Sequence, residues 1–295
     1  MRAPVGCVPI VWNNADLRDL APLVPYAEIL DAYVELGFEG TQHGLGFPEG
    51  EPLARELSAR GLRFAELYSA LDAGPEGLLP GSADIARRDL ARVIAARGEV
   101  LNVALDGGGD RDRWSGRVAA GAPRWPSAAY DELVTLLAEL VATAPDGVRI
   151  TFHPHTATWI EAPDEVDQLA ARLPGSGAGL CLDTGHHIVG GGDPVAALRD
   201  YGDLVTHVHV KDVDPAILER LRAGGIDGFA EAIRQRIFTE PGHGMLDLRG
   251  VIAALAARDY DGWLMVEQDS SWLPPVEAAG IGRRAVADAL AAVVA

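Results

Sequence analysis

The sequence has little cysteine and little positive charge, and both shortages argue against several classes of protein. Its two cysteines, Cys7 and Cys181, stand far apart in apolar runs, so we expect reduced, buried thiols rather than a disulfide framework. Lysine and arginine number 25 against 43 aspartates and glutamates, which gives a net charge of −18. A chain so acidic would repel nucleic acid and anionic membrane surfaces. It also lacks a signal-peptide pattern and any apolar run of roughly 20 residues. We therefore expect a cytoplasmic protein that binds neither nucleic acid nor a membrane.

Phosphate-binding motifs are lacking as well. The glycine-rich stretches 106–110 and 190–192 have neither the spacing of a dinucleotide-binding fingerprint nor the lysine of a phosphate-binding loop. Nucleotide cofactors are therefore not expected. What the chain does have is size and apolar content, since 48% of its 295 residues are hydrophobic. Such a chain buries a substantial core and is not disordered.

Short apolar runs alternate with longer segments of helical period, the pattern typical of βα units and a parallel sheet. Eight such repeats in about 300 residues favour an α/β fold of the (β/α)8 TIM-barrel type over an open doubly wound sheet. The first predicted turn, Trp12-Asn13-Asn14, also lacks the glycines of the doubly wound class. The predicted strands cover residues 6–11, 38–42, 62–68, 100–105, 148–153, 178–183, 204–209 and 263–267.

Two long stretches interrupt the repeat within what we expect to be a single TIM-barrel domain spanning residues 1–295. The first is the loop 106–126, rich in glycine, tryptophan and arginine. The second is the insertion 211–244, which we expect to be partly helical around 217–221 and 229–237. Long segments of this kind are usually lids or binding loops, so both are expected at the active-site face of the barrel. For the loop 106–126, a plain surface excursion is the alternative.

Ligand-type side chains end four consecutive predicted strands. These residues are His153, Asp183, His209 and Glu267, and their spacing follows the barrel repeat once the insertion is allowed for. Each alone could be an ordinary capping or loop residue, but four in register are expected to stand around one rim and bind a divalent cation. Mixed imidazole and carboxylate ligands suit Mn²⁺, Co²⁺, Fe²⁺ or Zn²⁺ better than Ca²⁺ or Mg²⁺. The sequence therefore predicts a metal enzyme.

Other polar residues near the strand ends allow more than one interpretation. His207 lies on the same strand face as His209 but one layer deeper, where a hydrogen-bonded core histidine is expected. Glu66, taken as the end of the third strand, fits a general acid or base or a member of a buried ion pair. His155 fits either a metal ligand or a neighbour of one, and Gln42 could hydrogen-bond a polyol.

Several sequence blocks resemble the xylose-isomerase-like TIM-barrel superfamily of sugar isomerases and epimerases, and within it the inosose dehydratase branch of inositol catabolism. The resemblance runs along most of the chain. Three blocks in order are the most specific for this branch: Asp-Thr-Gly-His in CLDTGHHIVGGGDP, His-Val-His-x-Lys-Asp in HVHVKDV, and Pro-Gly-x-Gly in FTEPGHGMLDL.

The resemblance implies a divalent metal, commonly Mn²⁺ or Co²⁺, with Asp183, His209 and Glu267 as matched ligands and His186 in contact with substrate. In the ketose epimerases of the superfamily, the fifth-strand ligand is a glutamate that shares proton transfer with the eighth-strand glutamate. His153 occupies that position here. The departure argues against 3-epimerisation and leaves elimination open.

The resulting prediction is a metal-dependent dehydratase that removes water from a cyclic keto-polyol, scyllo-inosose (2-keto-myo-inositol), through a metal-stabilised enediolate. The alternative is a metal-dependent isomerase or epimerase of an unphosphorylated or phosphorylated ketose. A catalytically silent sugar- or partner-binding barrel is a third possibility. The expected catalytic residues are Lys211, Glu66, His155 and His186, with acid and base unassigned. The expected substrate contacts are Trp12, Asn13, Gln42 and His186.

The apolar segment 286–294 near the end of the chain has two interpretations. It could form a contact between copies in a homo-oligomer, or it could be the eighth helix docked on its own barrel. The sequence does not decide between them.

Overall fold

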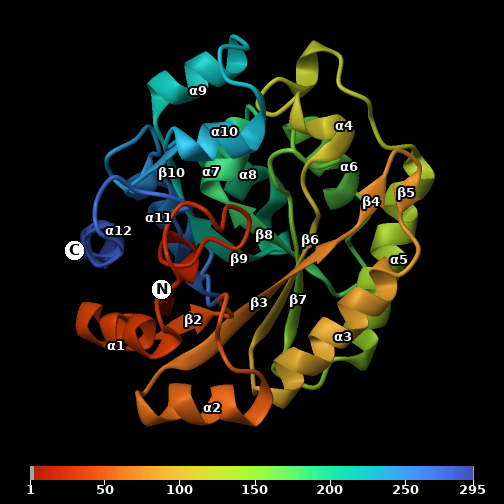
Figure 1. Ribbon diagram of the computed structural model, residues 1–295. Helices are drawn as coiled ribbons and strands as arrows, with labels where there is room; N and C mark the ends of the chain where they lie inside the picture. The colour runs from red at the N-terminus through yellow and green to blue at the C-terminus, as the bar shows by residue number, and fades with distance from the viewer. Residues whose placement is uncertain (1–2, 295) are drawn as a thin grey trace.

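A closed barrel of eight parallel strands forms the centre of the protein in the computed structural model, which describes residues 3–294. The strand order around the barrel is β1-β12-β9-β8-β7-β6-β3-β2, so each strand lies beside its neighbours along the chain and the last closes on the first (Figure 1). The predicted (β/α)8 fold is confirmed. The barrel strands are β1 (Val5–Cys7), β2 (Gly40–Gln42), β3 (Arg63–Leu71), β6 (Val100–Leu105), β7 (Arg149–His153), β8 (Gly179–Asp183), β9 (Val205–Val210) and β12 (Leu264–Val266).

Helices follow the strands and pack apolar faces on the outside of the barrel. In α5, for example, Leu133, Leu136, Leu137 and Leu140 are all buried, as their spacing predicts. The outer helices are α1 (Tyr26–Leu36), α2 (Gly50–Ala59), α3 (Ser82–Ala95), α5 (Ser127–Thr143), α6 (Pro163–Ala170), α8 (Pro194–Tyr201), α11 (Leu248–Ala256) and α12 (Pro275–Val294).

The last helix shows what segment 286–294 contacts within its own chain. Val286 and Ala289 of α12 are buried in the same core cluster as the barrel strands. The segment is therefore the eighth helix docked on its own barrel. Among residues 3–294, no helix has the length and apolar content that crossing a membrane requires.

Two strand boundaries differ from the prediction in ways that matter for the site. The first strand ends at Cys7, and Pro9–Val11 forms a 3₁₀ helix instead of continuing the sheet. Proline at position 9 has no N–H to donate to a ladder, which favours this early end. The third strand continues to Leu71 and pairs with β6 from Glu66 to Leu71. Glu66 is consequently inside β3 rather than at its end.

Bulky side chains fill the end of the barrel where the strands begin. Trp263, which precedes β12, is buried, and the guanidinium of Arg63 lies 4.4 Å from its ring centroid. Gly40 makes room for this ring, since a Cβ at that position would lie 2.6 Å from Trp263 Cη2. The functional cavity must therefore lie at the opposite, C-terminal end of the strands.

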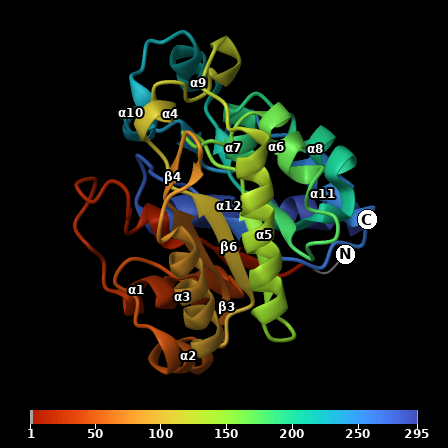
Figure 2. The same ribbon diagram turned by 90° about the vertical axis from the view of Figure 1, so that its right-hand side faces the viewer.

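The additional elements gather at that C-terminal end. Figures 1 and 2 show α4, α9 and α10 together at one end of the molecule, with α2 at the other. The loop 106–126 contains α4 (Gly109–Asp112) and a 3₁₀ turn, while α7 (Thr184–Val189) directly follows β8. The insertion 211–244 contains α9 (Pro215–Arg222) and α10 (Gly228–Arg234), near the predicted helical stretches. Two short hairpins complete the fold: β4 (Ala73–Gly74) with β5 (Gly77–Leu78), and β10 (Asp212–Val213) with β11 (Phe238–Thr239).

Candidate active site

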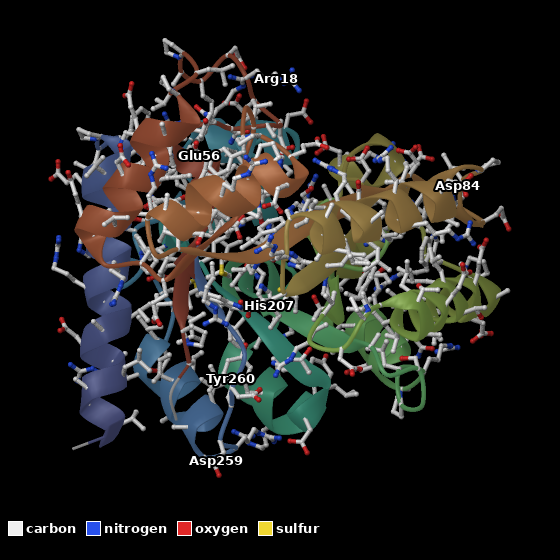
Figure 3. The ribbon with its side chains drawn as sticks, turned by 90° about the horizontal axis from the view of Figure 1, so that it is seen from below. Arg18, Glu56, Asp84, His207, Asp259 and Tyr260 are labelled. Carbon is white, nitrogen blue, oxygen red and sulfur yellow. The ribbon has the colours of Figure 1, made fainter. Side chains whose placement is uncertain are left out.

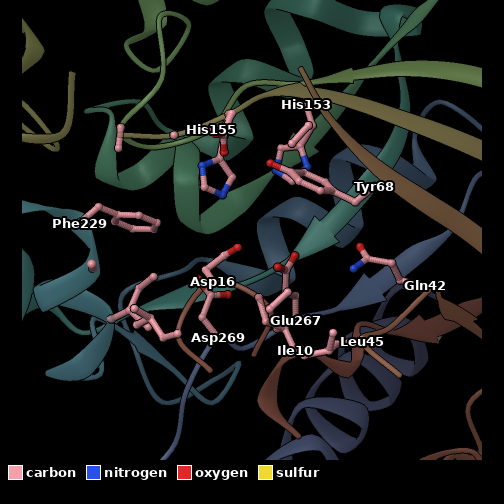
Figure 4. A pocket seen from close by; sticks show the side chains of 18 of the residues that line it. Ile10, Asp16, Gln42, Leu45, Tyr68, His153, His155, Phe229, Glu267 and Asp269 are labelled. Carbon is pink, nitrogen blue, oxygen red and sulfur yellow. The ribbon is translucent and has the colours of Figure 1, made fainter. Parts of the chain in front are cut away.

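A cavity of about 570 Å³ opens among the loops at the C-terminal ends of the strands. Residues from six barrel strands (β1, β2, β3, β6, β7 and β12) or the turns directly after them line it, together with Asp112 of α4 and residues of α10. Figure 4 shows His153, His155 and Tyr68 on one side and Asp16, Asp269 and Glu267 on the other. A cavity of this size at this end of a TIM barrel is where substrates bind.

Three of the predicted metal ligands meet beside this cavity, and of the three only Glu267 is among the described residues that line it. Asp183, His209 and Glu267 each offer a ligand atom, and these atoms lie within 4.8 Å of one another. His153 Nε2 lies 3.6 Å from Asp183 Oδ2. All four side chains are buried, and neither of these last two atoms has a hydrogen-bond partner among the described residues. Leaving a buried polar atom without a hydrogen-bond partner costs free energy. A divalent cation in contact with His153 Nε2 and Asp183 Oδ2 would remove that cost, and imidazole and carboxylate ligands suit such an ion.

A second layer of polar side chains lies directly beneath these residues. Glu66 Oε1 lies 2.8 Å from His209 Nε2, and Glu66 Oε2 lies 3.0 Å from His207 Nε2. Asn102 Nδ2 donates to Glu66 Oε2 at 2.9 Å. Burial opposes ionisation of Glu66, but His209 and His207 outweigh it and hold the pKa of the carboxyl well below its ordinary value. An ionised Glu66 accepts a hydrogen bond from His209 Nε2, which leaves Nδ1 as the nitrogen that faces Asp183 and Glu267.

His207 is the buried, hydrogen-bonded core histidine that its position predicts. Seen from below, it lies near the middle of the molecule, whereas Asp84 and Asp259 lie at the periphery (Figure 3). Cys181 is equally buried, and burial raises the pKa of its thiol, so it is an unreactive part of the core.

Lys211 forms the centre of a buried ionic cluster beside the predicted ligands. Its Nζ lies 2.9 Å from both Glu267 Oε1 and Asp269 Oδ1, and 3.4 Å from Asp183 Oδ2. Burial works against the ammonium, but Asp183, Asp269 and Glu267 outweigh it and keep the pKa of Lys211 well above its usual value. Lys211 is therefore a cation that neutralises the carboxylates. It is not among the residues that line the cavity.

Two stacked histidines connect Lys211 to the cavity. His186 Nε2 lies 3.0 Å from Lys211 Nζ, so it accepts a hydrogen bond from the ammonium. The rings of His155 and His186 have centroids 3.7 Å apart. Burial lowers the pKa of His155 to about 3, with His153 and Lys211 adding to the effect. His155 Nδ1 donates to the carbonyl of Thr156 at 2.8 Å, so its Nε2 is the unprotonated nitrogen.

The structure places five of the eleven predicted site residues in the lining of the cavity, and Asp183 and His209 are not among them. Gln42, Asn13 and His155 line it, together with His153 and Glu267. The amide of Asn13 is already engaged, since it donates to the carbonyls of Val24 and Leu45 and accepts from the Val24 amide. Asn13 therefore orders two loops and has little hydrogen-bonding capacity left for a substrate.

Trp12 and Glu66 are placed differently from the prediction. Trp12 does not line the cavity, because the 3₁₀ helix that ends the first strand early turns its ring against Tyr33, with centroids 5.3 Å apart. Glu66 lies one layer below the cavity, because β3 continues beyond it to Leu71. His186 and Lys211 lie behind His155 and Glu267 respectively, so they act on the cavity through these neighbours.

Sequence reasoning missed Tyr68 and Phe229, which also line the cavity. Tyr68 is the last residue of the predicted strand 62–68 and lies on the same face of β3 as Glu66, so taking Tyr68 rather than Glu66 as the strand end would have identified it. Phe229 belongs to α10, in the insertion, and its ring lies 5.6 Å from that of His155. No periodic signal marks a residue whose position depends on how an insertion folds back over the barrel.

Long-range contacts hold the segments that cover the cavity. Arg234 of α10 makes hydrogen bonds of 2.8 and 2.9 Å to the carboxylate of Asp19, in the loop after the first strand. Asp112 of α4 accepts a hydrogen bond from the Phe229 backbone N–H at 2.9 Å. We call these three segments, 13–25, 106–126 and 228–234, the cover. The cover joins parts of the chain that are far apart in sequence.

The closed barrel, with possible metal-ligand groups clustered at its strand ends, defines a TIM-barrel enzyme of the sugar-modifying type, and the comparisons agree on this class. Residues 30–289 match the family model described as "Xylose isomerase-like TIM barrel", so the chain belongs to this family. Its curated relatives include the rhizopine catabolism protein MocC of Rhizobium meliloti, 34% identical over 99% of this chain and 90% of that protein. Inosose dehydratase of Bacillus velezensis is 31% identical over 95% of this chain and 94% of its own length.

A solved structure of the IOLI protein, titled as having a bound zinc atom, has the same fold. Its TM-score is 0.69, and the match covers 98% of this chain and 99% of that one at 14% identity. At this identity the likeness shows the fold alone.

Proposed function

We propose that this protein is a metal-dependent dehydratase, a carbon–oxygen lyase that removes water from a cyclic keto-polyol of the scyllo-inosose type. The observation that carries the proposal is the meeting of Asp183, His209 and Glu267 directly beside a substrate-sized cavity that Glu267 lines. The near full-length similarity to proteins named inosose dehydratase supports the substrate class.

Asp183, His209 and Glu267 would hold the cation, with His153 as a fourth ligand. When bound, the cation supplies Lewis-acid polarisation of the ketone, which makes the neighbouring C–H more acidic. Mn²⁺ and Co²⁺ are the ions we propose first, since imidazole and carboxylate ligands suit them, and Fe²⁺ and Zn²⁺ share that preference.

His155 is the residue that we propose as the base. It lines the cavity, is neutral at physiological pH because burial lowers its pKa to about 3, and has its Nδ1 proton committed to the Thr156 carbonyl. Its Nε2 can therefore accept the α-proton of the keto-polyol. The imidazolium so formed returns that proton to the departing hydroxyl, so that one water leaves and no net proton is consumed.

Lys211 and His186 act as positioning residues in this scheme. The ammonium of Lys211 donates to His186 Nε2 and compensates the charge of Asp183 and Glu267. His186 in turn stacks on His155 and fixes the plane of its ring. Gln42, at the end of β2, is the hydroxyl contact that we propose for the polyol.

Incubation of the protein with scyllo-inosose and Mn²⁺ tests the proposal. We expect a new diketone absorbance and a product lighter than the substrate by one water. A product with the same mass as the substrate would show that the protein is an isomerase or epimerase and not a dehydratase. Protein that neither turns over the substrate nor gains thermal stability with Mn²⁺ or Co²⁺ would favour a silent binding barrel, because a ligand of the folded state must stabilise it.

A pair of histidine variants tests the role of the base. We expect His155→Gln to lower kcat by at least about 100-fold, in the range that general base catalysis supplies. His187→Gln is the matched control, because His187 is a buried histidine of α7 that does not line the cavity. Equal losses in the two variants would contradict the assignment of His155.

A further inference from the structure

Thr156 is a fully buried threonine that contacts the rings of two histidines of the site. It follows His155 directly in the turn after β7, and its exposed fraction is 0%. Its carbonyl accepts the Nδ1 proton of His155 at 2.8 Å, and its hydroxyl oxygen lies 2.8 Å from Nδ1 of His186. Thr156 is not among the described residues that line the cavity, so its effect on a bound molecule must pass through these two rings.

The contact of His186 with Lys211 fixes which nitrogen of the ring carries the proton. The ammonium of Lys211 has protons to donate but no lone pair, so Nε2 of His186, which lies 3.0 Å away, must accept. A neutral imidazole then carries its single proton on the other nitrogen, Nδ1. His186 therefore donates from Nδ1 to the hydroxyl oxygen of Thr156.

A second donor opposes this arrangement. The backbone N–H of Thr156 lies 3.3 Å from the same Nδ1 and would favour the tautomer in which Nδ1 is bare and Nε2 carries the proton. That tautomer would turn an N–H toward the Lys211 ammonium at a ring that is only 2% exposed, so water could not separate the two donors. Among the described residues, the Thr156 hydroxyl supplies the acceptor at Nδ1 that settles this competition.

We propose that Thr156 is a positioning residue that selects the tautomers of both histidines, that of His155 through its carbonyl and that of His186 through its hydroxyl. The inference rests on the proposed function, because His155 is the base in that scheme. With both protons on Nδ1, the bare Nε2 of His186 accepts from Lys211 and the bare Nε2 of His155 serves the cavity. The ring centroids of the two histidines are 3.7 Å apart, so a reorientation of His186 also displaces His155.

Removal of the hydroxyl alone isolates its role. Thr156→Val is nearly isosteric and leaves the carbonyl in place, so the bond from His155 persists. Nδ1 of His186 loses its acceptor and keeps the backbone N–H beside it. We therefore expect the proton of His186 to move, in part or in full, to Nε2. Thr156→Ser restores the hydroxyl and should restore the original tautomer.

Nitrogen NMR of the imidazole rings reads the tautomer directly. The full-length protein is labelled with ¹⁵N-histidine and loaded with Zn²⁺, because Mn²⁺ is paramagnetic and broadens nearby signals. Protonated and bare ring nitrogens resonate far apart, and His186→Gln identifies the signals of His186. We expect the proton on Nδ1 in the unmodified protein and in Thr156→Ser, and a population with the proton on Nε2 in Thr156→Val. Thr156→Ala, which removes the same hydroxyl, replaces the valine variant if that variant does not fold.

Two results would overturn the proposal. One is a proton on Nε2 of His186 in the unmodified protein, which needs no variant to observe. The other is an unchanged tautomer after the hydroxyl of Thr156 is removed.

Thr158→Val is the matched control. Thr158 is buried in the same turn, and its hydroxyl donates to the carbonyl of His155 at 2.7 Å without contacting a ring nitrogen. This variant should lose stability, because a buried hydrogen bond is removed, and should leave the His186 signals unchanged. A change in these signals as large as that in Thr156→Val would show that any disturbance of the turn moves the proton, and would refute the role of the Thr156 hydroxyl.

Turnover distinguishes positioning from substrate binding. With scyllo-inosose and Mn²⁺, we expect Thr156→Val to lower kcat at least about tenfold and to leave KM within about twofold, because a misplaced base affects the transition state more than the bound substrate. Thr156→Ser should recover most of the loss. An unchanged kcat in Thr156→Val would contradict the proposal.

The NMR measurement does not depend on turnover. Protein that shows the expected tautomers but dehydrates no scyllo-inosose would refute the proposed dehydratase and leave tautomer selection by Thr156 standing. Protein that dehydrates scyllo-inosose but keeps the same His186 tautomer in Thr156→Val would do the reverse.

Discussion

Replacing Glu66 by glutamine should weaken metal binding even though Glu66 is not a predicted ligand. Its two oxygens contact His209 Nε2 at 2.8 Å and His207 Nε2 at 3.0 Å, and Oε2 also accepts from Asn102. An amide can accept at only one of these positions. If its NH2 faces His209, two donors meet. If its NH2 occupies the Oε2 position, it meets the Asn102 donor instead.

Either orientation disturbs the residue that presents His209 to the cation. The orientation in which the amide NH2 faces His209 favours the His209 tautomer with its proton on Nδ1. That tautomer has no Nδ1 lone pair for a cation held beside Asp183 and Glu267. Loss of such a supporting carboxylate typically costs about 10- to 100-fold in metal affinity, or ~1.4–2.7 kcal/mol. We expect Glu66→Gln to fall in that range and to lose some stability as well, since a buried polar partner is mismatched.

Competition of Mn²⁺ between the protein and a chelating dye measures this affinity without requiring turnover. Glu165→Gln is the control, because Glu165 is a buried carboxylate that makes a bidentate contact with Arg111 away from the cavity. It should lower the free energy of unfolding and leave Mn²⁺ affinity unchanged. If Glu66→Gln binds Mn²⁺ within twofold of the unmodified protein, the reasoning about His209 is wrong.

Three further predictions concern stability. Arg111→Ala should cost roughly 1–3 kcal/mol in a urea titration, because it removes the buried bidentate partner of Glu165 and leaves only the more exposed Arg124 beside that carboxylate, and a loss under 1 kcal/mol would contradict that. Burial raises the pKa of Glu161 to about 7 from 4.5, although the Gly116 and Ala157 amides oppose the rise. The contribution of this group to stability is therefore full below pH 4.5 and falls by on the order of 2–3 kcal/mol as the pH rises to 7. The free energy of unfolding of Glu161→Gln, measured from pH 4.5 to 7.5, should decline less steeply with pH than that of the unmodified protein. An identical slope in the two proteins would exclude the effect. Gly40→Ala should cost ~1–3 kcal/mol by thermal denaturation, since its Cβ would lie 2.6 Å from Trp263 Cη2, and an unchanged melting temperature would show that the ring can move.

The barrel was predictable because its signals are local and repeated. Each βα unit has its own apolar run and its own helical stripe, and β6 was predicted with both ends correct. The four strand-end residues His153, Asp183, His209 and Glu267 were predictable as a group for the same reason. A parallel barrel places equivalent positions of successive strands at similar heights.

The parts that escaped prediction depend on contacts between distant segments. The extension of β3, which moves Glu66 below the cavity, follows from its pairing with β6 up to Leu71. The turn of Trp12 toward Tyr33 follows from the 3₁₀ helix at Pro9. The contribution of Phe229 follows from the folding of an insertion over the barrel, which no periodicity in the chain describes.

The ion pair between Arg234 and Asp19 has a consequence for how small molecules reach the metal residues. The two side chains are 38% and 66% exposed, and an ion pair so open to solvent is worth only about 0–1 kcal/mol. The ion pair therefore adds little to the closure of the cavity, and dissolved salt weakens it further. The 13–25 loop stays on α10 mainly because Leu17 shares a buried apolar cluster with Phe229 and Ile233, so a small molecule that enters by this edge must first separate that apolar packing.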